Sequence, residues 1–355
     1  MKKLNALAAC LLMIACAVPA AADTQETKTL HRVFDPVVVS GRDCGLTGHP
    51  IPNYGLYALT DDRLAPVPFQ IDEKDKNGLF VLAAGKLAAS DDDSAFDDND
   101  ELVFMAMDAG DRLFDKTLLP SGTDACVELE VTDPATQEKG WVYLAAFTGP
   151  ALVKSAVDYV SYAAAAFSTR NYSGRFDDDH PVGASEYAFE AGVGGDGEDF
   201  IDRIKVRLIM RSMGVTLHRS EEDIKVKELG CIDGSVRVIV YSENVTPLVL
   251  GIPASTTKQY TYYYNNYANF VFAAAFPPRP SLFRATIIDD FKEARGWTFY
   301  NSNNPGGHVI DGKMDDLDKK LDLSPWTWGA DQRQAVLLVR LDGAGRVPGK
   351  GLSLF

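Results

Sequence analysis

The sequence has few of the residues and motifs that mark common catalytic and metal centres. It contains no Cys-x-x-Cys-His for covalent haem, no Gly-x-Ser-x-Gly turn and no phosphate-binding loop. Its histidines never stand at the spacing of a zinc site; they are His31, His49, His180, His218 and His308. These absences exclude c-type haem and argue against a nucleotide enzyme or a common hydrolase.

Long apolar runs are also missing outside the first 22 residues. Two lysines precede the apolar stretch Leu4–Ala15, which is too short to span a membrane, and Ala20–Ala22 offers a cleavage site. We therefore expect a signal peptide over residues 1–22 and export to the periplasm or the cell exterior. Lipid attachment at Cys16 is the alternative, although the residues before it fit that processing less well. After cleavage, no stretch reaches the ~18 apolar residues of a membrane helix.

Only three cysteines remain beyond that leader: Cys44, Cys126 and Cys231. In an oxidising compartment one pair could form a disulfide, but the spacing does not select the pair. Because an unpaired cysteine behaves as a small hydrophobic side chain, we expect three separately buried thiols.

Basic residues are fewer than acidic residues. The chain has 35 Lys and Arg against 50 Asp and Glu, which gives a formal net charge of -15. Such a surface repels nucleic acid and anionic lipid, so we expect neither as a partner.

Apolar residues recur instead with a period of two. Val127, Leu129 and Val131 alternate with glutamates, and valines alternate with Arg237 and Tyr241 over 236–241. Successive side chains of a strand point to opposite faces, so each run predicts a strand with one buried and one solvated face. Asp233-Gly234 predicts a hairpin turn. Further strands are expected at Phe34–Val39, Tyr54–Leu59, Leu79–Leu82, Leu102–Met107, Trp141–Phe147, Phe270–Ala275, Leu282–Ile288 and Val336–Leu341.

Many short strands with very little helix predict a mostly β chain, folded as an antiparallel β-sandwich or super-sandwich. The one predicted helix is Lys313–Leu323, where apolar residues recur at helical spacing. Gly149-Pro150 marks an expected boundary between an N-terminal β region, residues 23–150, and a β-sandwich region, residues 151–355. The two regions could also form one continuous domain.

The segment Asp91–Glu101 carries seven carboxylates. Hard oxygen ligands at this density suit Ca²⁺, and the last of them run directly into a predicted strand. We predict weak calcium binding here, with a solvated acidic loop as the alternative. The predicted ligands are Asp97, Asp98, Asp100 and Glu101.

Aromatic and amide residues gather between positions 260 and 267. Flat rings stack on sugar faces while amides and phenols bond hydroxyl groups, so this segment predicts a glycan-binding cleft. Alternating tyrosines also fill the strand faces of β-sandwich cores, which is the alternative. The predicted ligand-binding residues are Tyr260, Tyr262, Tyr264, Asn265, Asn266 and Tyr267.

Three pieces of the chain resemble a group of exported bacterial β-sandwich proteins of unknown function. The pieces are Val67–Asp72 with Asp75 and Gly78, Asp100–Ala106, and Glu222–Ile224 with Asp233–Arg237, although Ser235 stands where that group usually has proline. Some relatives of the group resemble polysaccharide lyases and mutarotase-like super-sandwiches. The resemblance covers about half the chain, supports export and a β-sandwich, and matches no catalytic residue. The glycine-rich end at Phe355 leads us to expect that longer relatives continue further.

Together these features predict an exported, acidic β-sandwich protein that binds a polysaccharide or another cell-surface ligand, without an identifiable active site. The alternatives are a carbohydrate-active enzyme, either a lyase or a glycoside hydrolase, and an envelope scaffold. Two carboxylates converging on the tyrosine segment would favour an enzyme, whereas an aromatic face without them would favour binding. A large exposed apolar patch would favour a scaffold.

Overall fold

The computed structural model describes most of the chain between residues 26 and 340. The described residues are 26–85, 93–113, 115–151, 153–177, 183–212, 214–247, 255–275, 281–301, 304–313, 316, 326–330 and 336–340. The predicted signal peptide, Cys16 and most of the predicted helix Lys313–Leu323 lie outside them. Among the described residues, no helix is both long enough and apolar enough to cross a membrane.

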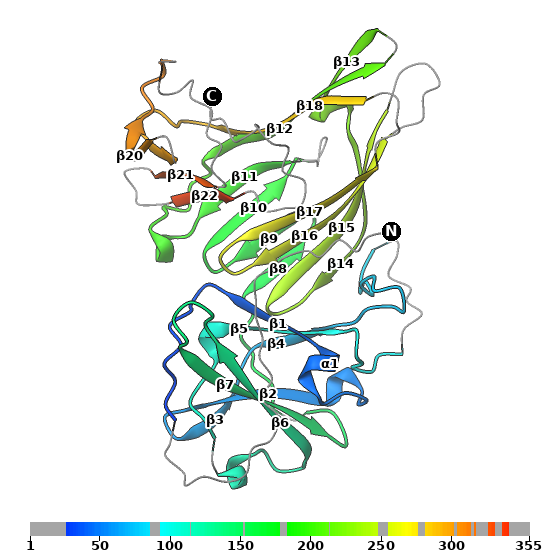
Figure 1. The fold of residues 1–355 in the computed structure, drawn as a ribbon, viewed down its shortest axis with the longest axis vertical. Coiled ribbons are helices and arrows are strands. Elements are labelled where there is room, and N and C mark those ends of the chain that lie inside the picture. Colours follow the sequence, from blue (N-terminus) through cyan, green and yellow to red (C-terminus); the bar gives the residue numbers. More distant parts are fainter. Residues whose placement is uncertain are drawn as a thin grey trace.

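Two antiparallel sheets form the lower part of the molecule in Figure 1. One sheet has the order β3-β2-β7-β6, and the other has the order β1-β5-β4. Their facing side chains enclose a core that includes Leu56, Phe104 and Leu144, all fully buried. The strands are β1 (Pro36–Ser40), β2 (Tyr54–Thr60), β3 (Arg63–Pro66), β4 (Phe69–Asp72), β5 (Glu101–Met105), β6 (Thr123–Thr132) and β7 (Lys139–Phe147).

Four further antiparallel sheets follow after Phe147 and form the upper part of Figure 1. Two of them, β11-β10-β9-β8 and β14-β15-β16-β17, pack around a second core that contains Phe167, Val238 and Tyr263. Their strands are β8 (Val160–Ala163), β9 (Ala166–Thr169), β10 (Tyr172–Phe176), β11 (Ala184–Phe189), β14 (Lys225–Asp233), β15 (Arg237–Thr246), β16 (Ser255–Tyr264) and β17 (Ala268–Ala275).

The remaining two sheets have the orders β13-β12-β18 and β20-β19-β21-β22. Helix is confined to short turns within the described residues, and every strand pair is antiparallel, which confirms the predicted fold class. The strands are β12 (Ile201–Ser212), β13 (Val215–Ser220), β18 (Ser281–Phe291), β19 (Thr298–Asn301), β20 (Asn304–Val309), β21 (Trp326–Ala330) and β22 (Val336–Arg340). The helical turns are α1 (Gly41–Cys44), η1 (Ile51–Asn53), η2 (Ala106–Asp108), η3 (Lys116–Leu118), η4 (Ala191–Val193) and η5 (Glu221–Asp223).

Strand β5 belongs to both cores. Leu102 and Phe104 point into the first core, whereas Val103 and Met105 pack in the second, and all four are fully buried. Because successive strand residues face opposite sides, a continuous apolar run suits a strand covered on both faces. The sheet β1-β5-β4 is therefore a shared layer between the two parts.

Strand β15 is likewise buried on both faces. Val236, Val238 and Val240 face the second core as predicted, but Arg237 and Tyr241 on the opposite face are 2% and 8% exposed. The expectation of a solvated second face is wrong here, because residues of the segment 72–85 cover it.

Most of the predicted strands and the Asp233-Gly234 hairpin are present, whereas Leu79–Leu82 forms only an isolated bridge. The sheet β11-β10-β9-β8 was not anticipated, because its alanines, serines and aromatics do not repeat with a clear period. The three cysteines are unpaired; Cys44 is buried, but Cys126 is exposed, contrary to the expectation of three buried thiols.

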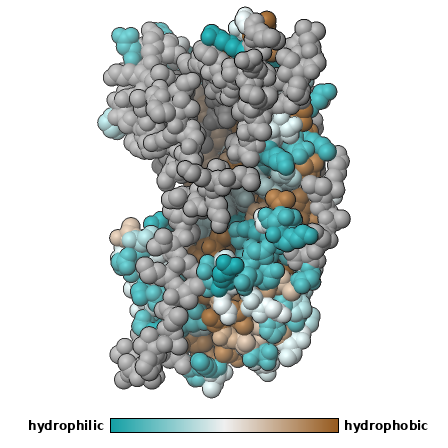
Figure 2. Space-filling view, turned by 45° about the vertical axis from the view of Figure 1, so that its right-hand side comes forward, coloured by the Kyte–Doolittle hydropathy of each residue, from teal (hydrophilic) through white to brown (hydrophobic). Residues whose placement is uncertain are grey.

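The surface shown in Figure 2 is mixed in character. Apolar residues at this face are interspersed with polar ones among the described part of the chain. Exposed large apolar side chains also come from distant elements, for example Phe34, Leu79 and Val215.

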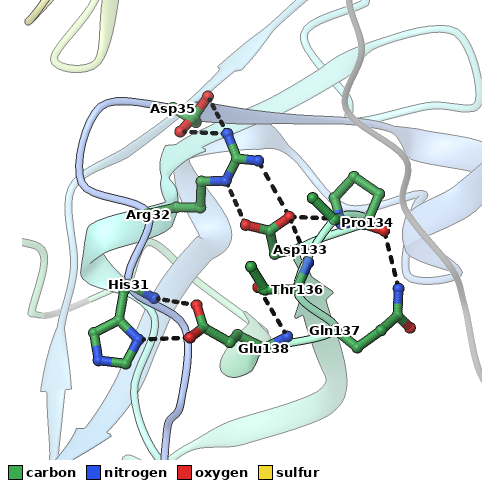
Figure 3. A network of polar contacts seen from close by, with 9 residues as sticks. His31, Arg32, Asp35, Asp133, Pro134, Thr136, Gln137 and Glu138 are labelled. Atoms are coloured by element: carbon green, nitrogen blue, oxygen red, sulfur yellow. Dashed lines mark hydrogen bonds and ion pairs between the residues drawn. The ribbon is translucent and has the colours of Figure 1, made fainter.

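The first described residues are fixed along the turn between β6 and β7 (Figure 3). Arg32 donates to both carboxylate oxygens of Asp133, over 2.6 and 3.1 Å, and also pairs with Asp35. His31 contacts Glu138 over 3.0 Å. The side-chain hydrogen bond from Arg32 and backbone N–H donors lower the pKa of the Asp133 carboxyl.

Candidate functional site

The predicted ligand-binding residues occupy β16 and the turn that leads into β17. As alternation requires, Tyr260, Tyr262 and Tyr264 share one face of β16, and Tyr263 points into the second core on the other face. Tyr264 is only 6% exposed, and the rings of Tyr260 and Tyr262 lie 5.8 and 6.2 Å from that of Phe80. Tyr260 and Tyr262 are partly buried and pack against Phe80, which comes from the segment after β4, whereas Tyr264 contacts Arg237 and Tyr267.

The turn residues are arranged differently. Tyr267 is 41% exposed, whereas Asn265 is buried and its Oδ1 has no hydrogen-bond partner among the described residues. Asn266 is partly exposed; its Oδ1 accepts a hydrogen bond from Asn171, and its Nδ2 donates to the carbonyl of Phe34 over 3.5 Å. The six residues thus divide into a covered strand and a partly exposed hairpin tip.

Beneath the covered tyrosines lies an ionic cluster centred on Arg237. Arg237 on β15 lies directly opposite Tyr264 on the neighbouring strand β16. Its Nη1 donates a hydrogen bond to the Tyr264 hydroxyl over 3.2 Å. Its Nε donates to Asp72 over 2.8 Å, and its Nη2 contacts both Asp72 and Glu101. The guanidinium also stacks 5.5 Å from the ring centres of Phe80 and Tyr262. We call these residues the Arg237 cluster.

Charge is balanced within the Arg237 cluster. Lys74 pairs with Glu101, so two cations face the two carboxylates of Asp72 and Glu101. Burial by itself would raise the pKa of Glu101, but Arg237 and Lys74 hold it below its usual value. Asp72 is more completely buried, and this desolvation raises its pKa against the opposing effect of Arg237.

The polar side chain of Gln70 connects this cluster to the β14–β15 hairpin. Its Oε1 accepts hydrogen bonds from the backbone N–H groups of Val236 and Arg237, over 2.9 and 2.8 Å, and its Nε2 donates to Asp72 over 2.7 Å. A Cβ atom at Gly234 would lie only 2.3–2.5 Å from the Gln70 amide, so a larger residue there would displace this amide from its hydrogen bonds.

The segments Val67–Asp72, Asp100–Ala106 and Asp233–Arg237, which are far apart in the sequence, meet at this point. Each segment supplies one charged residue: the guanidinium group of Arg237 contacts the carboxylates of both Asp72 and Glu101. Sequence reasoning did not predict the cluster, because Arg237 lay on the face expected to be solvated. The available signal was an arginine followed and preceded by valines in a strand whose opposite face is apolar.

The four predicted calcium ligands have other partners. Asp100 is fully buried and accepts hydrogen bonds from the backbone N–H groups of Lys74 and Asp97, over 2.7 and 2.9 Å. Asp98 pairs with Arg42 across an exposed contact, and Glu101 belongs to the Arg237 cluster. Within the described part of the chain, no group of three or more His, Cys, Asp or Glu residues is placed to hold a metal. Asp91 and Asp92 lie outside that part, and calcium binding stays a prediction.

A second titratable group lies where the two parts of the molecule meet. Asp108 of η2 accepts a hydrogen bond from the Tyr159 hydroxyl over 2.8 Å, and its other oxygen is buried with no partner in the described part of the chain. Burial raises the pKa of Asp108 to about 6, although the hydrogen bond and the charges of Lys28 and Arg170 oppose this. The guanidinium of Arg170 lies 4.8 Å above the Tyr159 ring.

Comparisons with known proteins leave the family open. A scan against protein families and a search of curated proteins each find no match. Among solved structures, an alpha-mannosidase from Enterococcus faecalis V583 aligns with a TM-score of 0.44 and 7% sequence identity, over 87% of this chain and 36% of that chain. The chain thus spans about a third of the length of that mannosidase. This level of similarity assigns neither a family nor an activity.

Proposed function

We propose that the protein binds a neutral polysaccharide through the tip of the β16–β17 hairpin. The observation that carries this proposal is the contact between Asn266 and the Phe34 carbonyl, which brings two exposed aromatic residues to one amide. Phe34, whose carbonyl accepts this hydrogen bond, is 60% exposed. Tyr267, the residue after Asn266, is 41% exposed. Aromatic faces stack on the C–H faces of sugars, and an amide beside them can bond sugar hydroxyl groups.

The hairpin tip is held in place by its own hydrogen bonds. The backbone N–H of Tyr264 donates to the Tyr267 carbonyl over 2.9 Å, and the Thr169 hydroxyl donates to the Asn265 carbonyl over 3.1 Å. The rings of Tyr264 and Tyr267 lie 4.9 Å apart, so the exposed ring rests on a buried one. Such preorganisation reduces the entropy lost when a ligand binds.

The net charge of -15 supports a neutral ligand over an acidic one. A polyuronate or a sulfated glycan would be repelled over the whole surface unless cations screened it. The carboxylates that reach the tyrosine strand, Asp72 and Glu101, are already paired with cations. That pairing favours binding over acid–base catalysis at this strand, because a general acid or base needs a carboxyl group that can exchange its proton with substrate.

Affinity electrophoresis of the purified protein in gels that contain glucans, mannans or xylans tests the proposal, with polyuronates as acidic counterparts. We expect retardation by at least one neutral polysaccharide and none by a polyuronate. Tyr267→Ala and Phe34→Ala should each weaken that binding about fivefold or more. Each substitution removes a stacking ring that contributes about 1 kcal/mol of binding free energy. Leu118→Ala is the matched control, since Leu118 is 42% exposed on η3.

Circular dichroism of each variant separates lost binding from lost folding. Unchanged affinity in folded Tyr267→Ala and Phe34→Ala proteins would place the ligand elsewhere. Migration unaffected by every neutral polysaccharide would overturn the proposal, and release of reducing ends or unsaturated sugars from any of them would favour the enzyme alternative.

A further inference from the structure

A pocket of about 360 Å³ opens where three segments of the chain meet beside Ile51 of η1. One side comes from β4 and the residues before it, another from the connection between β7 and β8, and the third from the β14–β15 hairpin. Its volume lies near the lower end of the roughly 300–1,000 Å³ that small-molecule sites occupy. The pocket is distinct from the hairpin tip, because Phe34, Asn266 and Tyr267 are not among the residues that line it.

The walls of the pocket are mainly apolar. They include Ile51, Val67, Phe69, Ile71 and Ile232, of which all except Val67 are partly exposed. An apolar wall of this kind takes up an aliphatic or aromatic group, because binding removes that group and the wall from water.

Most of the polar groups in the pocket already have partners. Asp72 pairs with Arg237, Gln70 makes three hydrogen bonds, and the Ser235 hydroxyl donates to the Phe69 carbonyl over 3.0 Å. The Ser155 hydroxyl accepts a hydrogen bond from the backbone N–H of Val157 over 3.2 Å. These intramolecular contacts fix the shape of the pocket, and the groups that make them are already bonded within the protein.

Lys154 is the exception. Its side chain is exposed, and its ammonium lies 5.7 Å from the centre of the Phe69 ring, with no ion pair or hydrogen bond to any residue within the described ranges. A positive charge with free donors, beside an apolar wall, complements an anion that carries an apolar body. The Asp72 carboxylate does not cancel this preference, since Arg237 neutralises it.

We propose that this pocket binds a small monocarboxylate with an aliphatic or aromatic body, with the carboxylate at Lys154 and the body against Phe69 and Ile232. Because the pocket joins β4 to the β14–β15 hairpin, such a ligand contacts both parts of the molecule. It therefore stabilises their junction by mass action, since it binds only the folded chain.

Isothermal titration and thermal melting of the purified protein with octanoate test this inference. Octan-1-ol and octylammonium are the neutral and cationic probes of the same chain length, all used below their micelle concentrations. We expect saturable binding of one octanoate per chain, at least tenfold tighter than octan-1-ol, with no measurable binding of octylammonium. Octanoate should also raise the melting temperature.

Three variants locate the site. Lys154→Gln should abolish the preference for octanoate over octan-1-ol, and Lys154→Arg should retain it. Ser155→Trp should block both ligands by filling the pocket, and Lys116→Gln, at an exposed lysine of η3, should change nothing. Equal affinities for octanoate and octan-1-ol in the unmodified protein, or octanoate binding unaffected by Lys154→Gln, would overturn the inference. If Ser155→Trp does not fold, the Lys154 variants still decide it.

Discussion

At the scale of single residues, Arg237 is a buried cation held by both charged and aromatic neighbours. Its side chain is 3% exposed, and it contacts two carboxylates, a phenol and two aromatic faces. A buried ion pair seldom adds stability over an apolar replacement, because desolvation offsets the attraction. Removal of one partner is different, since it leaves an uncompensated charge inside the protein.

Arg237→Met should therefore lower the free energy of unfolding by about 3–5 kcal/mol, since Asp72 stays buried without its cation. Arg42→Met is the control, because the Arg42–Asp98 pair is exposed and should contribute at most about 1 kcal/mol. Urea denaturation measures both. The double variant Arg237→Met with Asp72→Leu should recover part of the loss, and an Arg237→Met protein as stable as Arg42→Met would contradict this account.

The Asp108 carboxyl should make the free energy of unfolding depend on pH. Its pKa of about 6 lies above the ordinary value of 3.8, so the folded state binds this proton more tightly than the unfolded state. The resulting stabilisation is complete below about pH 4 and is lost as the pH rises through about 6. Asp108→Asn stays neutral throughout, so its stability relative to the unmodified protein should rise by about 2–3 kcal/mol between pH 4 and 7. A difference that does not vary with pH in urea denaturation would refute this.

At the scale of elements, substitutions in β15 and β14 test which strand faces point into the core, as residue alternation predicts. Val238→Asp places an unpaired charge in the second core, where Val238 is fully buried, and should destabilise the fold by more than about 3 kcal/mol. Lys225→Asp on the exposed side of β14 should change stability by no more than about 0.5 kcal/mol. Chemical denaturation in which the two substitutions are equally harmful would show that the register is wrong.

The same strand shows what sequence could and could not predict. Period-two patterns located β6, β12, β14 and β15, and in β6 the alternate residues Leu129 and Val131 are buried as the pattern predicts. Burial of Arg237 and Tyr241 depends on a segment that precedes them by about 160 residues, and no local pattern encodes that contact. The tyrosine face of β16 was predicted by alternation, but its cover by Phe80 was not, for the same reason.

At the scale of the whole molecule, the shared strand β5 determines how the two parts depend on each other. Leu102 and Phe104 lie in the first core and Val103 and Met105 in the second, so neither core is complete without this strand. The Arg237 cluster and the Gln70 hydrogen bonds add polar contacts across the same junction. These contacts favour unfolding of both parts in one cooperative transition, although an expected boundary falls between β7 and β8.

Hydrogen exchange measured by mass spectrometry tests this coupling in the intact protein. Met105→Ala removes a fully buried side chain from the second core and should cost about 2–5 kcal/mol. If the parts unfold together, slow amides of β7 lose as much protection as those of β16. Leu144→Ala in the first core should produce the same paired loss. Loss confined to β16 in one variant and to β7 in the other would show instead that the two cores open independently, and β5 would then belong energetically to only one of them.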